Sequence, residues 1–106
     1  MSEARIGKSI VIKGEVEGAE DILVDGRLEG AITLAKCRLT VGSNATITAD
    51  MKAQDVVVLG RIHGDIFATG SVDLRKTAQV QGNIKAARIA IEDGAVMKGH
   101  LELNVP

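Results

Sequence analysis

The chain has 106 residues, of which 45% are hydrophobic and 1% aromatic, and its formal net charge is −1. This length predicts a single domain with enough apolar residues for a core. The balanced charge and the near absence of aromatic side chains argue against a nucleic-acid-binding surface. With Cys37 as the single cysteine, an internal disulfide is excluded, which fits a reducing cytoplasm.

Residues 1–9 are expected to form a short N-terminal tail, because they carry mixed charges and lack the apolar stretch of a signal peptide. No apolar run elsewhere approaches the roughly 20 residues that a membrane-spanning helix needs. We therefore expect a cytoplasmic protein, for which a position at the inner face of the membrane would depend on partners.

From Ile10 onward, aliphatic residues alternate with polar ones almost without interruption, and no helical spacing is sustained. Alternation with a period of two places one set of side chains on one face of a strand. Ile and Val together number 22, against 8 Leu, a bias toward β-branched residues that favours strands. The sequence therefore predicts an all-β domain over residues 10–104, with 105–106 as its C-terminal end.

One short phrase returns along this domain: an aliphatic residue, a variable residue, Gly or Ala, a variable residue and another aliphatic. Its last five copies begin 19, 15, 18 and 17 residues apart, at Leu28, Ile47, Ile62, Val80 and Met97. Corners are predicted at 42–44, 75–77 and 92–94. A repeat of about 17 residues with three short strands predicts a triangular parallel β-helix of five to six coils. We favour the right-handed form, because the strict hexapeptide repeat usual in left-handed β-helices is missing. The recurring small residue is expected to leave room for bulkier neighbours in a narrow interior and to let the backbone bend.

A stack of coils has two ends, and the sequence shows no capping helix at either of them. The terminal coils are expected to expose an apolar cross-section of the core and unpaired strand edges, which favour association. The residues predicted to carry self-association are Ile10, Ile12 and Val16 at one end, and Met97, Leu101 and Leu103 at the other.

The chain from about Ile6 to Leu103 resembles the bactofilins, bacterial polymer-forming cytoskeletal proteins. The segments that carry the resemblance are GEVEGAEDILVDGRLEGAI, LTVGSNATI, VVVLGRIHGDI, AQVQGNIKA and IAIEDGAVMKGHL. The resemblance implies a right-handed β-helix that assembles end to end into filaments without nucleotide or another cofactor. It also implies that these filaments scaffold cell-wall enzymes, shape determinants or chromosome-positioning proteins.

Two departures from the family are visible. Many members carry an N-terminal tail that targets the membrane, whereas residues 1–9 are short and mixed in charge, so no direct membrane binding is expected. Many also have an aromatic residue where this chain has Met97, whose flexible side chain packs adaptably.

The direction of stacking stays open. The resemblance implies that like ends meet, whereas an acidic N-terminal third and a more basic C-terminal third favour unlike ends. Exposed charges are screened over about 8–10 Å, so salt bears on the balance.

Single residues offer weaker candidates. His63 and His100 lie about two coils apart without a third histidine, which favours solvated side chains over a zinc site. Cys37 lies between two basic residues, but a small corner residue is the simpler interpretation. Asp50, Asp65 and Asn83 follow the small residue in three copies and predict a column of oxygen atoms on one outer face, more often a solvated face than a cation site.

The leading hypothesis is a self-assembling cytoskeletal subunit with no catalytic role, cofactor, metal or small-molecule substrate. Its partners would be further copies of itself and proteins of the cell wall or cell shape. The alternative is a dimeric β-helical binding module of a division or cell-wall regulator. A trimeric enzyme of the acyltransferase or carbonic-anhydrase kind is disfavoured by the missing hexapeptide repeat and third histidine.

Overall fold

The computed structural model describes residues 3–18 and 20–103, and within them it contains strands and turns but no helix. The strands are β1 (Glu3–Ile6), β2 (Val11–Gly18), β3 (Asp21–Val24), β4 (Arg27–Val41), β5 (Thr46–Val58), β6 (Arg61–His63), β7 (Ile66–Ala68), β8 (Ser71–Leu74), β9 (Gln79–Gln81), β10 (Ile84–Ala86), β11 (Arg88–Ile91), β12 (Val96–Lys98) and β13 (Leu101–Leu103).

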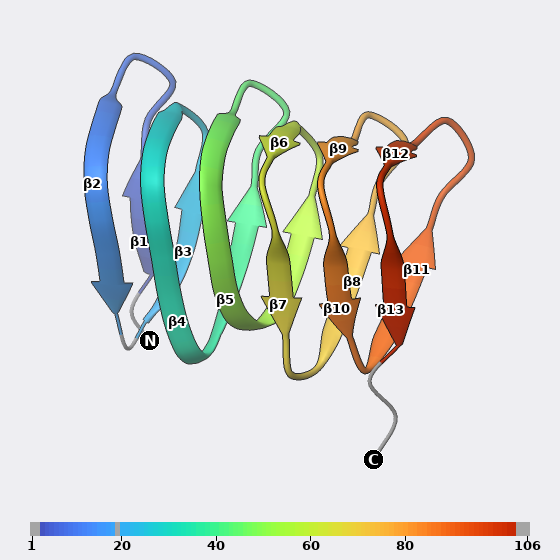
Figure 1. The fold of residues 1–106 in the computed structure, drawn as a ribbon. Coiled ribbons are helices and arrows are strands. Elements are labelled where there is room, and N and C mark those ends of the chain that lie inside the picture. The colour runs from blue at the N-terminus through green and yellow to red at the C-terminus, as the bar shows by residue number, and fades with distance from the viewer. Residues whose placement is uncertain (1–2, 19, 104–106) are drawn as a thin grey trace.

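All strand pairs are parallel, and each strand of an interior coil pairs with the equivalent strands one coil before and one coil after it. The result is a row of about 6 coils with β1 and β2 at one end and β11, β12 and β13 at the other (Figure 1). The described chain measures 32 × 27 × 24 Å along its principal axes. The predicted fold, an all-β parallel β-helix in one domain, is confirmed.

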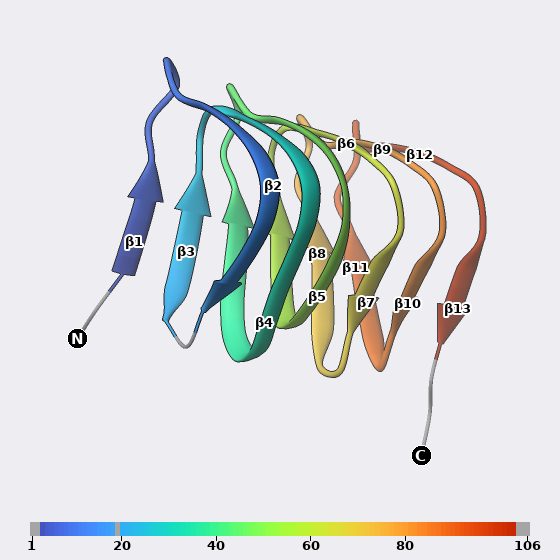
Figure 2. The same ribbon diagram turned by 60° about the vertical axis from the view of Figure 1, so that its left-hand side comes forward.

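Each coil has three walls. The first contains β1, β3, the last residues of β4 and β5, then β8 and β11. The second contains the starts of β2, β4 and β5, then β6, β9 and β12. The third contains the end of β2, the middle of β4 and β5, then β7, β10 and β13. Figure 2 shows the first wall on the opposite side of the coils from β7, β10 and β13.

The interior is filled by aliphatic side chains stacked in columns along the axis. In the first wall, Val24, Val41, Val58 and Leu74 follow one another and are all fully buried. No polar or charged side chain among the described residues is buried. Because burial of each aliphatic side chain contributes about 1.5–3 kcal/mol, these columns are the main source of stability.

The repeated small residue lies at a corner, where the expected backbone bend is found. Gly14, Gly30, Ala49, Gly64, Gly82 and Gly99 occupy one corner column, between the second and third walls. A Cβ placed on Gly82 would lie 2.0 Å from the carbonyl oxygen of Gly64, and φ of Gly82 is +142°. Close approach of neighbouring backbones and a positive φ therefore demand glycine at position 82, as predicted for the bend. Ala49, which is buried in the same column, has no positive φ and carries a Cβ.

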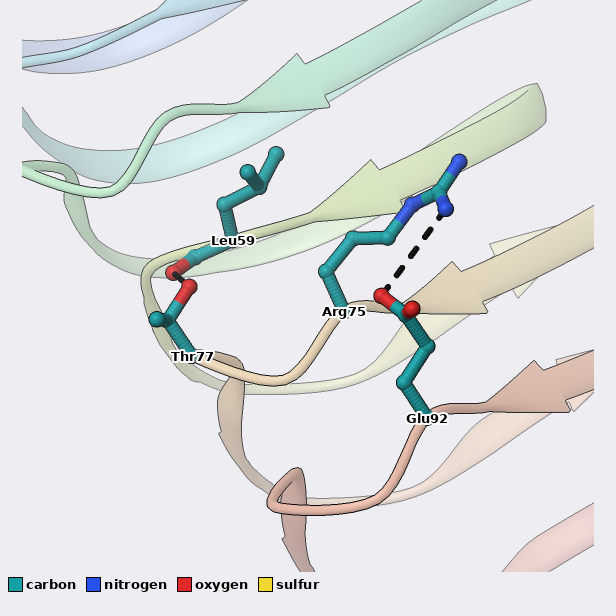
Figure 3. A network of polar contacts seen from close by, with 4 residues as sticks. All are labelled: Leu59, Arg75, Thr77 and Glu92. Carbon is teal, nitrogen blue, oxygen red and sulfur yellow. Dashed lines mark hydrogen bonds and ion pairs between the residues drawn. The ribbon is translucent and has the colours of Figure 1, made fainter.

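The predicted corners at 42–44, 75–77 and 92–94 are turns in the structure. Their backbone bonds run from Ala45 N–H to the oxygen of Gly42 (3.0 Å), from Ala78 to Arg75 (2.8 Å) and from Ala95 to Glu92 (3.1 Å). Side chains add links between successive coils at this corner (Figure 3). The Thr77 hydroxyl donates to the carbonyl of Leu59 (2.6 Å), and Arg75 pairs with Glu92 at 3.8 Å. The ion pair is half-exposed, so its contribution is small.

The unequal intervals between repeats reflect corners of unequal length. Between the first and second walls, the chain advances five residues from Val41 to Thr46 but three from Val58 to Arg61, and the corner between the third and first walls varies as well. Leu34 pairs with Ala53 and Arg38 pairs with Asp55. Between these two pairs β4 therefore advances by four residues, whereas β5 advances by two. The additional residues include Cys37, which is half-buried against the core.

The segment 1–9, expected as a tail, contains β1. Residues 3–6 pair in register with residues 21–24, so that Ile6 adjoins Val24 and packs against the core. A four-residue segment whose single large aliphatic side chain, Ile6, is its last carries too little alternation to predict a strand, and only the neighbouring coil supplies its hydrogen bonds.

Candidate assembly surfaces

The N-terminal end of the rod is formed by β1 and β2. Among the described strands, β1 pairs only with β3 and β2 only with β4, so their outer edges carry unpaired backbone groups. Ile12 and Val16 point inward and are half-buried, whereas Leu28 and Ile32, their neighbours one coil inward, are fully buried.

Ile10 occupies an unusual position at this end. The hydrogen-bond ladder aligns it with Gly26, Ala45, Gly60 and Ala78, a corner column of small residues. A Cβ on Gly26 would lie 2.4 Å from the carbonyl oxygen of Ile10, so the next coil leaves no room for a side chain there. A bulky residue fits at the start of the column, where Ile10 is 46% exposed.

The C-terminal end is formed by β11, β12 and β13, which pair among the described strands only with β8, β9 and β10. Leu101 and Leu103 continue the columns of Ile84 and Ala86, and Met97 continues the column of Val80. Leu103 is 59% exposed although Ala86 is fully buried. These side chains face the axis, but Leu101 and Leu103 are exposed and Met97 is half-buried, because no described coil follows them.

The six predicted association residues therefore lie on the two end coils, three at each end. Their part in association remains a prediction. Sequence reasoning missed further members of the same surfaces: Ile6 at the N-terminal end, and Ile89, Ile91 and Ala95 at the C-terminal end. Their signal is the register itself, since each continues a buried column, but that register becomes readable only when strands are aligned coil by coil.

The column after the small residue forms a ladder of side-chain hydrogen bonds. The carboxylate Oδ1 of Asp50 accepts the N–H of Asp65 at 3.3 Å, and that of Asp65 accepts the N–H of Asn83 at 3.1 Å. The Asn83 side-chain oxygen then accepts the N–H of His100 at 3.4 Å. The column thus links successive coils at the corner, and the described residues include no group of three or more His, Cys, Asp or Glu arranged to hold a metal ion.

The two histidines are not brought together. His63 lies outward on β6 in the second wall, whereas His100 precedes β13 in the third wall, and both are exposed. Cys37 lies in a corner of a different part of the coil. Within the described residues no helix is long and apolar enough to cross a membrane.

Comparison with known proteins agrees with this architecture. The sequence profile of the family described as "Bactofilin: Polymer-forming cytoskeletal" matches residues 4–102. The chain is 41% identical over 105 residues to bactofilin BacO of Myxococcus xanthus, covering 99% of this chain and 82% of BacO. It is 44% identical over 100 residues to BacN of the same organism, covering 94% of this chain and 88% of BacN. It is 37% identical over 98 residues to BacP, where it covers 92% of this chain but 40% of BacP.

A solved structure is also similar. The bactofilin of Thermus thermophilus, determined by cryo-EM as double helical filaments, superposes with a TM-score of 0.88 at 25% identity. The superposition covers 95% of this chain and 99% of that one. A match of this quality requires the two β-helices to have the same hand. On the profile match and the sequence identities together, the chain belongs to the bactofilin family of polymer-forming cytoskeletal proteins.

Proposed function

We propose that this protein polymerises end to end through its two terminal coils, without nucleotide, and that the filament scaffolds proteins of the bacterial cell wall, cell shape or chromosome positioning in the cytoplasm. The observation that carries the proposal is the rise in exposure within each inward column at the end coil. Leu101 is 46% exposed and Ile84, its neighbour one coil inward, is 1% exposed.

Each terminal coil can interact with another subunit in two ways, by hydrogen bonding along its strand edges and by contact between aliphatic side chains. The unpaired edges of β1 and β2, and of β11, β12 and β13, can continue the strand ladder across a subunit boundary. Inward aliphatic side chains occur on every wall of both end coils, with Ile6, Ile12 and Val16 at one end and Ile91, Met97 and Leu101 at the other. Contact between ends therefore buries aliphatic against aliphatic surface whichever ends meet.

A nucleotide has no evident role in such an assembly. The described glycines are distributed among the corners of the coils and do not precede a helix, so they form no phosphate-binding loop. The energy of association would come from burial of apolar surface and from hydrogen bonding between strand edges.

The proposed scaffolding role is supported by the regular repetition of identical subunits along a filament. A filament of identical rods presents the same outer faces at regular intervals, and a partner with several binding segments gains effective concentration from such an array. The partners would bind these outer faces, since the end coils are occupied by the neighbouring subunits.

Negative-stain electron microscopy and high-speed pelleting of the purified protein test the proposal. We expect filaments in the absence of nucleotide and in the presence of EDTA, at low and at physiological salt. A monodisperse monomer at high concentration across these conditions would refute polymerisation, and a discrete dimer would support the binding-module alternative instead.

A further inference from the structure

The three walls of the rod carry different charges on their outer faces. The outer face of the second wall, which we name the basic face, has four cationic side chains, Lys13, Arg27, Arg61 and Lys98, and one anionic side chain, Glu29. The outer face of the third wall, the acidic face, has five anionic side chains against two cationic ones: Glu15, Glu17, Asp50, Asp65 and Glu102 against Lys52 and Lys85.

The outer face of the first wall, which we name the balanced face, has three cationic and three anionic side chains among the residues whose side chains the structure describes: Arg5, Arg38, Arg88, Asp21, Asp55 and Asp73. Beside the charged column runs a second outward column that includes Leu23, Thr40 and Val57. These three side chains are half-buried, although no described element covers the face. The outward side chains of the other two walls include exposed ones, such as Thr48 and Lys52, and half-buried ones, such as Ala31 and Thr46.

The order of charges along the balanced face is complementary to the same order on a second rod that runs in the opposite direction. Along the axis the first column reads Asp21, Arg38, Asp55, Ser71 and Arg88. A twofold axis between the coils of Arg38 and Asp55 places Arg38 of one rod opposite Asp55 of a second rod, and the reverse. The same axis places Thr40 opposite Val57, and at the margins Asp21 opposite Ser71 and Leu23 opposite Asp73.

From this pattern we propose that the balanced face is the surface through which two filaments of this protein pair side by side, with the rods antiparallel. The occupant of the face is a second copy of the same chain. A closed two-stranded assembly uses one self-complementary surface on both partners. Like-with-like contact of the basic or the acidic face would instead bring together surfaces that each carry an excess of three like charges.

The contacts across such an interface are sterically reasonable. Facing sheets pack about 10 Å apart, a gap that an extended arginine and an aspartate can span. The Asp55 oxygen Oδ1 accepts both the N–H and the hydroxyl of Ser71, each at 3.1 Å, which orients the carboxylate and leaves its second oxygen for a partner arginine. The inference rests on the proposed polymerisation, and it agrees with the double helical filaments formed by the similar Thermus thermophilus protein.

Two matched pairs of variants test the assignment by electron microscopy of filament width. Val57→Lys and Thr48→Lys add the same charge to the same strand, β5, on the balanced and the basic face respectively. Arg38→Glu and Arg61→Glu make the same reversal on these two faces. We expect the wild type, Thr48→Lys and Arg61→Glu to form paired filaments, and Val57→Lys and Arg38→Glu to form single filaments of unchanged length.

Circular dichroism checks that each variant is folded. Arg38→Glu places a carboxylate beside Asp55 in its own chain, whereas a lysine at position 57 lies beside Asp73, so Val57→Lys is the safer variant for folding. Paired filaments in both balanced-face variants, or single filaments in the two basic-face controls alone, would overturn the assignment.

The failure of the inference and of polymerisation can be told apart. Single filaments of the wild type would refute side-by-side pairing while supporting end-to-end growth. If the wild type forms no filaments, the proposed polymerisation is refuted. Analytical ultracentrifugation then tests whether single rods pair through the balanced face. A two-rod dimer that is lost in Val57→Lys and kept in Thr48→Lys supports the balanced face, and any other result overturns it.

Discussion

Leu101 lies directly beyond Ile84 in one inward column of the third wall, and the exposed fraction of the side chain rises from 1% at Ile84 to 46% at Leu101. Both residues have the same orientation and the same kind of side chain. The difference arises because Ile84 has a coil on either side, whereas no described coil follows Leu101. This relationship is the observation behind the proposed assembly surfaces, and it underlies the first two predictions.

Leu101→Glu is expected to abolish filaments while leaving the subunit folded. The substitution places a carboxylate in a surface that assembly removes from water, where an unpaired charge is costly. Gln79→Glu, outward on β9, is the matched control and is expected to leave filaments intact. Pelleting and circular dichroism provide the measurements, and filaments of Leu101→Glu at wild-type yield would contradict the prediction.

The same variant, combined with Val57→Lys so that side-by-side dimers do not form, reports the direction of stacking. If like ends meet, Leu101→Glu retains an intact N-terminal contact and sediments as a dimer. If unlike ends meet, both contacts need the altered end and the variant is a monomer. Mixing it with Ile12→Glu, altered at the other end, distinguishes the cases further, because only unlike-end stacking converts two monomeric variants into a mixed dimer. Sedimentation velocity measures each species.

Gly82→Ala is expected to destabilise the coil by more than Gly14→Ala. Both glycines have positive φ, +142° and +131°, so each alanine pays a backbone strain of about 1–3 kcal/mol. An added Cβ at Gly82 would also meet the Gly64 carbonyl at 2.0 Å, whereas at Gly14 nothing lies within 4 Å. Urea unfolding of the two variants, in an assembly-deficient background such as Leu101→Glu, measures the difference. Equal losses would contradict the steric explanation of the glycine column.

Asp65→Ala is expected to lower the free energy of unfolding by about 0.5–1.5 kcal/mol, the net value of a typical hydrogen bond. The Asp65 carboxylate accepts the N–H of Asn83, and alanine leaves that donor to water. Asp65→Asn retains a side-chain oxygen in the same place and is expected to stay close to the wild type. Thermal or urea unfolding compares the three proteins, and a loss in Asp65→Asn equal to that in Asp65→Ala would show that charge, not hydrogen bonding, matters there.

Much of this architecture was readable from the chain. Alternation such as Val56–Val58 predicted strands, the repeat near 17 residues predicted stacked coils, and the corners at 42–44, 75–77 and 92–94 were predicted from turn residues. These features are local or strictly periodic, so the sequence alone determines them. The resemblance carried by whole segments gave the family, which the comparisons confirm.

Only the tertiary structure decided which residues adjoin across coils. The strand β1, the ladder from Asp50 to His100, the backbone contact that requires Gly82 and the reversed charge order of the balanced face all depend on register between segments about 17 residues apart. Corners of unequal length, such as the additional residues before Arg38, shift that register without changing the alternation. The sequence therefore determined that the chain forms a stack with two apolar ends, and the structure decided which side chains form the ends and which line each face.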